Sequence, residues 1–250
     1  MKESDYLTPQ CSDYFFRPNP RVMSDSRTFE EVKAQVLSAH SCSGPKEKVK
    51  FYNTWAEKYE QDVAILDYNA PFLAAECIAS HFTGEKESAV ILDVACGTGL
   101  VSGHLKKMGF RHFVGVDASE KMLNLATKTG LYQELKKSML CQDPFPVQDE
   151  SYDIVVIVGA LSIGHVPVSV IKELWQATKP GGFVCMTTRG NADNFEYKTE
   201  LERVIRVMEE EKKWSCVAIN EVANWEKAVS EHERGYITGV VYLYQRAHQV

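Results

Sequence analysis

The sequence lacks several features that mark secreted and membrane proteins. Its seven cysteines include no Cys-x-x-Cys pair. An odd number of scattered cysteines does not build a closed disulfide framework, so we expect reduced thiols in the cytosol or the nucleus. Met1–Pro20 has no apolar core of the kind that a signal peptide needs. The longest uncharged stretch, Ile154–Ile171, is broken by glycines, a histidine and a proline, and therefore predicts a strand and its loop rather than a membrane span.

The chain also lacks a concentration of positive charge. Its net charge is -6, and the densest basic stretch, Lys46–Lys50, is interrupted by Glu47 and Val49. A nucleic-acid partner needs a concentrated basic surface and is therefore disfavoured. We predict no membrane association and no metal site, and we expect a monomer. A length of 250 residues with 44% hydrophobic and 25% charged residues fits one globular domain with a terminal extension.

The extension is predicted to span residues 1–44 and the domain residues 45–250. Met1–Arg27 is polar and contains prolines, so the extension is expected to be partly disordered or loosely docked. Within it, Thr28 and Glu31 have the spacing of a capping box before a helix over Phe29–Ala39. The domain begins with a helix over Lys46–Asp62, whose aromatic residues recur at helical spacing. These aromatic residues are expected either to pack on the domain or to form a helical lid over a pocket.

Strands that alternate with helices predict a parallel sheet with right-handed crossovers. Strands are predicted from Val90 and at Phe113–Val116, Lys137–Gln142, Tyr152–Val158, Phe183–Thr188, Trp214–Val222 and Ile237–Gln245. Helices are predicted at Pro71–Phe82, Leu100–Met108, Glu120–Thr129, Val170–Thr178 and Leu201–Lys213. The charged segment Asn224–Gly235 is expected to be a surface insertion.

One apolar run that ends in glycines organises the chain. Val90–Val94 is typical of a strand buried on both faces. Gly97 and Gly99 follow, and they let the backbone turn sharply and approach a ligand without a Cβ in the way. A strand, a glycine turn and a helix together predict a ligand pocket at the carboxyl end of the strand.

Polar and polarisable residues at the following strand ends predict a nucleoside ligand. Asp117 ends the next strand, where an acid can accept hydrogen bonds from both hydroxyls of a ribose. Asp143 follows the third predicted strand, where a carboxylate can accept a hydrogen bond from the exocyclic amine of an adenine. Met122 is placed to lie on a purine face. The plainer interpretations are a turn residue for Asp143 and a core residue for Met122.

These motifs, taken in order, resemble the class I S-adenosylmethionine-dependent methyltransferases over about Phe51–Gln245. The resemblance rests on Leu92-Asp93-Val94-Ala95-Cys96-Gly97-Thr98-Gly99, Val116-Asp117-Ala118-Ser119, Met122, Asp143, Tyr152-Asp153-Ile154-Val155 and Lys179-Pro180-Gly181-Gly182. At closer range, Val158-Gly159-Ala160-Leu161-Ser162 with His165-Val166 resembles the Williams–Beuren syndrome region methyltransferase-like proteins. The resemblance implies an α/β fold with a Rossmann-like seven-stranded sheet, mostly parallel with an antiparallel last strand, and helices on both faces.

The resemblance further implies S-adenosyl-L-methionine as cofactor and a set of residues that would bind it. The glycine turn would line the amino-acid tail, Asp117 would hold the ribose, and the end of the fourth strand would lie under the sulfonium. In similar proteins an aromatic helix before the domain closes over the cofactor, which adds Tyr59 and, with less support, Tyr52 and Trp55. The implied cofactor-binding residues are Tyr59, Asp93, Ala95, Cys96, Gly97, Thr98, Gly99, Asp117, Ala118, Met122, Asp143, Gly159 and Ala160.

The methyl acceptor is not readable from the sequence beyond its broad class. Gly159-Ala160-Leu161-Ser162 stands where an Asp/Asn-Pro-Pro-aromatic run would indicate methylation of adenine or of a glutamine amide, which leaves a small molecule or a protein side chain. His165 follows the fourth strand and is a candidate general base for a hydroxyl or amine, although a structural loop histidine is the plainer interpretation.

Two other functions stay open at this point. A non-catalytic module that binds the same cofactor has the same motifs, because fold does not fix function. A nicotinamide-dependent oxidoreductase shares the strand, the turn and the ribose acid, but Ser102 stands where its third glycine belongs.

Overall fold

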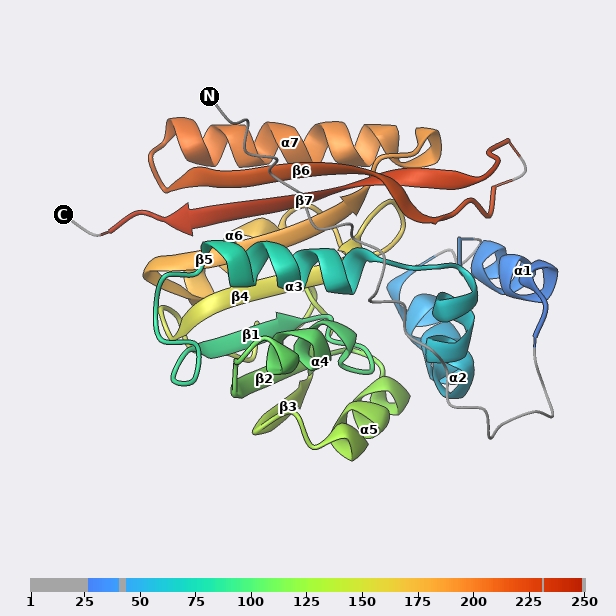
Figure 1. The fold of residues 1–250 in the computed structure, drawn as a ribbon, viewed down its shortest axis with the longest axis horizontal. Helices are drawn as coiled ribbons and strands as arrows, with labels where there is room; N and C mark the ends of the chain where they lie inside the picture. The colour runs from blue at the N-terminus through green and yellow to red at the C-terminus, as the bar shows by residue number, and fades with distance from the viewer. Residues whose placement is uncertain (1–26, 41–43, 231, 249–250) are drawn as a thin grey trace, which may run out of the picture.

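A seven-stranded sheet with the order β3-β2-β1-β4-β5-β7-β6 forms the centre of the molecule (Figure 1). The computed structural model describes residues 27–40, 44–230 and 232–248. The strands are β1 (Val90–Val94), β2 (His112–Asp117), β3 (Glu134–Lys137), β4 (Tyr152–Leu161), β5 (Thr178–Arg189), β6 (Trp214–Lys227) and β7 (Tyr236–Arg246). The helices are α1 (Phe29–His40), α2 (Pro45–Ile65), α3 (Ala70–His81), α4 (Leu100–Lys107), α5 (Glu120–Thr129), α6 (Val170–Ala177) and α7 (Phe195–Glu210), with a 3-10 turn at Ala192–Asn194.

The direction of the strands confirms the predicted sheet. β1 pairs in parallel with β2 and β4, while β7 runs antiparallel to both β5 and β6. The order of the strands changes direction at β1 and β4, and open α/β sheets bind ligands at such a switch point, beyond the carboxyl ends of the strands.

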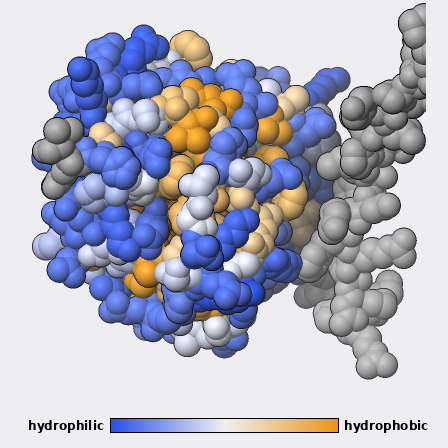
Figure 2. Space-filling view, turned by 60° about the vertical axis from the view of Figure 1, so that its left-hand side comes forward, coloured by the Kyte–Doolittle hydropathy of each residue, from blue (hydrophilic) through white to orange (hydrophobic). Residues whose placement is uncertain are grey.

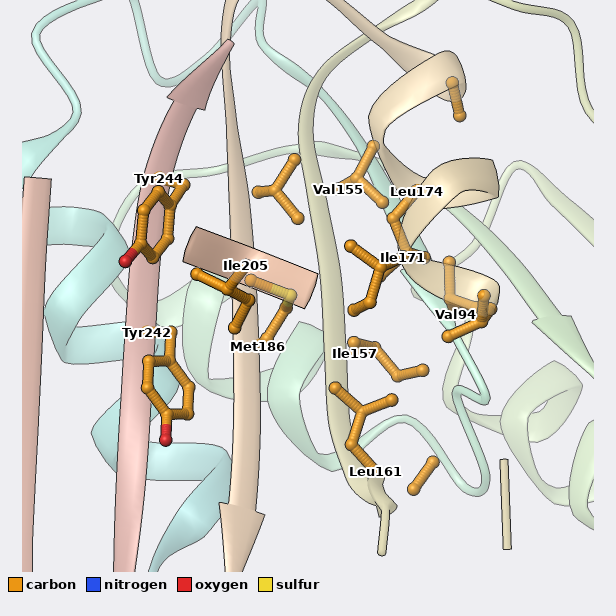
Figure 3. Packing of buried hydrophobic residues seen from close by; sticks show 14 of the residues in the cluster. Val94, Val155, Ile157, Leu161, Ile171, Leu174, Met186, Ile205, Tyr242 and Tyr244 are labelled. Atoms are coloured by element: carbon orange, nitrogen blue, oxygen red, sulfur yellow. The ribbon is translucent and has the colours of Figure 1, made fainter. Parts of the chain in front are cut away.

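Helices cover both faces of the sheet, as predicted. Successive side chains of a strand point to opposite faces, so the apolar run of β4 supplies two cores at once. Figure 3 shows the core in which Val155 and Ile157 of β4 meet Ile171 and Leu174 of α6. In the other core, Ile154 and Val156 belong to one cluster with residues of α3 and α4.

The first two helices lie beyond the carboxyl ends of the parallel strands, at the right of Figure 1. The capping box is confirmed, since Thr28 N donates to Glu31 Oε2 at 2.7 Å and Glu31 N to Thr28 Oγ1 at 3.3 Å. Val32 and Val36 of α1 form a cluster with Trp55 of α2. The part of the extension described here therefore packs against the helix that follows it, whereas the expectation for Met1–Ser26 lies outside the described residues.

Several predicted boundaries are wrong. The third strand is Glu134–Lys137 rather than Lys137–Gln142, and the last helix begins at Phe195 rather than Leu201. The fifth strand begins at Thr178 rather than Phe183. Asn224–Gly235 is not wholly a surface insertion, because β6 continues to Lys227 and Trp225 is only 1% exposed. A Cβ on Gly239 of β7 would lie 2.0 Å from the Trp225 ring, so the missing side chain at this position makes the room for the indole.

The face of the molecule in Figure 2 is mainly hydrophilic, and hydrophobic residues gather on it along a band between hydrophilic regions. In the part of the chain that the structure describes, no helix combines the length and the hydropathy needed to cross a bilayer.

Candidate functional site

A cavity of about 580 Å³ lies where the carboxyl ends of β1, β2 and β4 meet α2. Small-molecule sites typically have about 300–1,000 Å³, so this cavity has the size of one. The predicted site residues that line it are Tyr59, Ala95, Gly97, Asp117, Ala118, Met122, Gly159, Ala160 and His165. The predicted site residues outside its lining are Asp93, Cys96, Thr98, Gly99 and Asp143.

The turn after β1 brings bare backbone to the cavity. Gly97 has φ +54° and Gly99 has φ +98°, a left-handed conformation that glycine adopts without strain. A Cβ on Gly97 would meet no atom within 4 Å, because that side of the residue faces open space. The left-handed backbone therefore favours glycine at both positions, and Gly97 also leaves the wall of the cavity free of a side chain.

Asp117 joins this turn to the end of β2. Its Oδ2 accepts a hydrogen bond from Gly97 N at 2.9 Å, and its Oδ1 accepts one from Ser119 N at 2.7 Å. Burial raises the pKa of the Asp117 carboxyl, and the backbone donors lower it in part. Each carboxylate oxygen can accept more than one hydrogen bond, so a carboxylate held this way still has acceptor capacity toward the cavity.

Asp93 supports the turn from beneath instead of lining the cavity. It is 1% exposed, and its Oδ2 accepts hydrogen bonds from Ser102 Oγ and Tyr132 OH, both at 2.7 Å. Burial raises the pKa of this carboxyl to about 6 despite these donors. Next to the turn, the hydroxyl of Thr98 is buried without a hydrogen-bond partner among the described residues.

The structure does not bring Asp143 to the cavity. Its Oδ2 accepts a hydrogen bond from Met139 N at 2.8 Å, which closes the loop after β3 as a turn residue does. The four residues before it, Met139, Leu140, Cys141 and Gln142, line the cavity in its place. Sequence reasoning missed these four because it extended the third strand as far as Gln142 and so looked for the ligand contact one residue too late.

At the other end of the cavity, His165 contacts Tyr52 of α2. The Nε2 atom of His165 lies 3.1 Å from Tyr52 OH, and its Nδ1 lies 3.0 Å from Ser162 Oγ and 3.3 Å from the carbonyl oxygen of Ile163. A carbonyl oxygen only accepts, so this geometry favours the proton on Nδ1 and a lone pair on Nε2. Tyr52 and Tyr59 both line the cavity, which confirms that α2 forms one of its walls.

A second, smaller cavity of about 40 Å³ lies behind this wall and shares Tyr52, Tyr59, Gly159 and His165 with the first. It contains an ion pair that the sequence did not predict, in which Arg189 Nε lies 2.7 Å from Glu226 Oε1. Burial lowers the pKa of Arg189, but the carboxylate of Glu226 and three nearby tyrosine hydroxyls together outweigh burial and raise the pKa overall. In the sequence, Arg189 follows the fifth predicted strand and Glu226 lies in the segment interpreted as a surface insertion, and no spacing between them indicates the pair.

Comparisons with known proteins agree with this geometry. Residues 91–182 match a family model described as a methyltransferase domain. The chain is 48% identical over 193 residues to the human Methyltransferase-like protein 27, which covers 77% of this chain and 78% of that protein. The chain belongs to the class I S-adenosylmethionine-dependent methyltransferases. The predicted resemblance to the Williams–Beuren syndrome region methyltransferase-like proteins is consistent with this relative.

More distant matches support the same family and fold. A Ubiquinone biosynthesis O-methyltransferase from Hydrogenovibrio crunogenus is 32% identical over 171 residues, which are 66% of this chain and 67% of that protein. The solved structure of an S-adenosylmethionine-dependent methyltransferase from Thermotoga maritima superposes with a TM-score of 0.53 at 19% identity, covering 78% of this chain and 98% of that one. The methyltransferase is therefore an enzyme that transfers a methyl group from S-adenosylmethionine, and neither the oxidoreductase nor the non-catalytic module is supported.

Proposed function

We propose that the methyltransferase binds S-adenosylmethionine in the large cavity and transfers its methyl group to a small molecule. The observation that supports the cofactor end most directly is the Asp117 carboxylate beside the Gly97 turn, both on the cavity wall. The side-chain-free surface of Gly97 suits a polar tail that approaches the backbone, and the carboxylate suits a pair of ribose hydroxyls. Met122 and Leu140 offer apolar surface to a planar base. The residues present therefore fit the cofactor.

The chain's own contribution to the reaction is positioning and the removal of a proton. The bound cofactor supplies a methyl group that its positively charged sulfur already activates, so the protein needs no strong acid. α2 and its aromatic residues form one wall of the cavity, which limits the access of water from that side and favours a correctly aligned nucleophile.

We propose His165 as the general base for that nucleophile. Its Nε2 lone pair lies 3.1 Å from Tyr52 OH in this structure. When an acceptor hydroxyl replaces Tyr52 as the donor, Nε2 can take the proton that this hydroxyl loses as its oxygen bonds to the methyl carbon. The match to a protein named as an O-methyltransferase supports a hydroxyl acceptor. That relative is named for the biosynthesis of ubiquinone, a small molecule, which favours a small acceptor over a protein side chain.

We also propose that the enzyme acts as a monomer in the cytosol or the nucleus. The described cysteines are all free, and Cys77, Cys96 and Cys185 are buried. Free buried thiols are typical of proteins from reducing compartments.

Replacement of the ribose acid tests the cofactor site. We expect Asp117→Ala to weaken the binding of S-adenosylhomocysteine by at least about 100-fold, because hydrogen bonds to a charged group contribute about 1.5–3 kcal/mol each. Isothermal titration calorimetry measures this loss directly, and circular dichroism checks the fold. Asp149→Ala, which removes an exposed carboxylate outside the cavity lining, is the matched control. Unchanged affinity in Asp117→Ala would contradict the assignment.

A labelled methyl donor tests the acceptor class. Cell extract is separated into a low-molecular-mass filtrate and a protein fraction, and each is incubated with the enzyme and tritiated S-adenosylmethionine. We expect label to move into the filtrate and the transfer to fall by about 100-fold in His165→Gln, the usual contribution of a general base. Transfer confined to the protein fraction would contradict a small-molecule acceptor.

A further inference from the structure

We propose that Asn53 of α2 is a positioning residue for the cofactor, acting on the Asp117 carboxylate through Ser119. This inference rests on the proposed binding of the cofactor ribose at Asp117. Asn53 lies outside the lining of the large cavity, so it acts without touching the ligand space.

Two groups at the start of α5 donate to one oxygen of Asn53. Ser119 Oγ donates to Asn53 Oδ1 at 2.8 Å, and Lys121 N donates to the same oxygen at 3.1 Å. The link is therefore a two-point contact between α2 and the segment that directly follows β2. Among the helix pairs, α2 and α5 are in close contact although they are far apart along the chain.

Ser119 passes this contact on to the carboxylate. Its hydroxyl hydrogen points to Asn53, which leaves an oxygen lone pair to accept from Met122 N at 3.2 Å as the helix N-cap. Its backbone N–H donates to Asp117 Oδ1 at 2.7 Å. Because Ser119 is 2% exposed and held on three sides, its position fixes one oxygen of the carboxylate.

Asn53 also takes part in the cap of α5. The first turn of a helix has backbone N–H groups with no partner inside the helix. Ser119 satisfies the N–H of Met122, and Asn53 satisfies the N–H of Lys121 from a different helix. The N–H of Lys121 is thus capped only while α2 is docked, which couples the wall of the cavity to the geometry of its ribose acid.

The test compares side chains at position 53 by calorimetry with S-adenosylhomocysteine. We expect Asn53→Ala to weaken binding about tenfold, because it removes both hydrogen bonds to the Asp117–Lys121 segment. We expect Asn53→Asp to stay within about threefold of the wild type, since a carboxylate oxygen accepts the same two hydrogen bonds and favours a helix N-terminus. Thr54→Ala is the matched control, because its exposed hydroxyl only donates to Lys50 O one turn earlier on α2.

Hydrogen exchange of backbone amides separates positioning from general destabilisation. In Asn53→Ala without ligand, the amides of Lys121 and Met122 are expected to exchange at least tenfold faster, while amides of the central strand β4 are unchanged. Rescue of both affinity and protection by Asn53→Asp supports the proposal. Asn53→Ser, whose side chain is shorter but still polar, replaces the alanine variant if that variant does not fold, with the same expected loss.

The outcomes distinguish this inference from the function on which it rests. Wild-type affinity in both Asn53→Ala and Asn53→Ser would overturn the inference, as would an equal loss in Asn53→Asp. If Asp117→Ala loses binding while the position 53 variants keep it, the cofactor site stands and only the positioning role fails. If Asp117→Ala binds normally, the proposed ribose site itself fails.

Discussion

Gly159 and Tyr68 form the contact that we expect to be the least tolerant of added volume. Gly159 lies at the end of β4 with φ +74°, where it lines both cavities. A Cβ at this position would lie 2.2 Å from the hydroxyl oxygen of Tyr68 but 3.4 Å from the next ring atom, Cζ. The hydroxyl alone is therefore in the way of Gly159→Ala.

The expected cost of Gly159→Ala has two parts. A left-handed conformation costs a residue with a Cβ about 1–2 kcal/mol. Forcing an extra methyl group into a packed site costs about 1–3 kcal/mol more. Tyr68→Phe removes the hydroxyl and with it the second part, so Gly159→Ala in that background should keep only the conformational cost of about 1–2 kcal/mol.

Chemical denaturation of the four proteins of this cycle measures the coupling between the two positions. No hydrogen bond joins the Tyr68 hydroxyl to another group in the described part of the chain, so we expect Tyr68→Phe alone to change the free energy of unfolding by less than about 1 kcal/mol. The coupling free energy should be about 1–3 kcal/mol, with the double variant more stable than the sum of the single effects predicts. Strictly additive effects would refute the reasoning, because they would show that the hydroxyl does not oppose the new methyl group.

Two further predictions concern buried charges. Burial raises the pKa of Asp93 to about 6, so the unfolded chain releases this proton at a lower pH than the folded protein does, and the carboxylate destabilises the fold increasingly from about pH 4 to pH 6. Asp93→Asn keeps an oxygen that can accept from Ser102. Its free energy of unfolding, compared with that of the wild type, should rise by about 3 kcal/mol as the pH goes from about 4 to about 7, measured by denaturation at each pH. A difference that does not change with pH would contradict this. Glu226→Gln removes the buried carboxylate that lies 2.7 Å from Nε of Arg189 and should lower the free energy of unfolding by about 3 kcal/mol in the same assay. The control is Glu221→Gln, an exposed position on the same strand, and equal effects at both positions would contradict the role of burial.

The alternation of apolar runs and glycine turns made most of the fold predictable. Each buried parallel strand is a local pattern, so β1, β4 and the core of β5 are found without tertiary information. The third and sixth strands have wrong predicted boundaries for a common reason. Where a local pattern fits both a strand and a loop, tertiary contacts decide which of the two forms. Met139 and Leu140 look like strand residues, but their apolar surface lines the cavity instead of the sheet. Trp225 continues β6 because Gly239 on the neighbouring strand leaves room for its ring.

One half of the candidate site could be predicted from the sequence, and the other half could not, because it depends on tertiary contacts. The cofactor half comes from one stretch of chain, in which Gly97 and Asp117 follow consecutive strands and meet at 2.9 Å. The proposed acceptor half joins Tyr52 to His165 across 113 residues. Behind it, Arg189 of β5 meets Glu226 of β6, with β7 between the two strands. No spacing in the sequence indicates such a meeting. An enzyme built this way can change its acceptor by substitutions on α2 and near the ends of β4, β5 and β6 while the contacts of the cofactor half stay as they are. Similarity across the family therefore carries over the methyl donor, whereas the acceptor must be identified from the residues around Tyr52 and His165 of this chain.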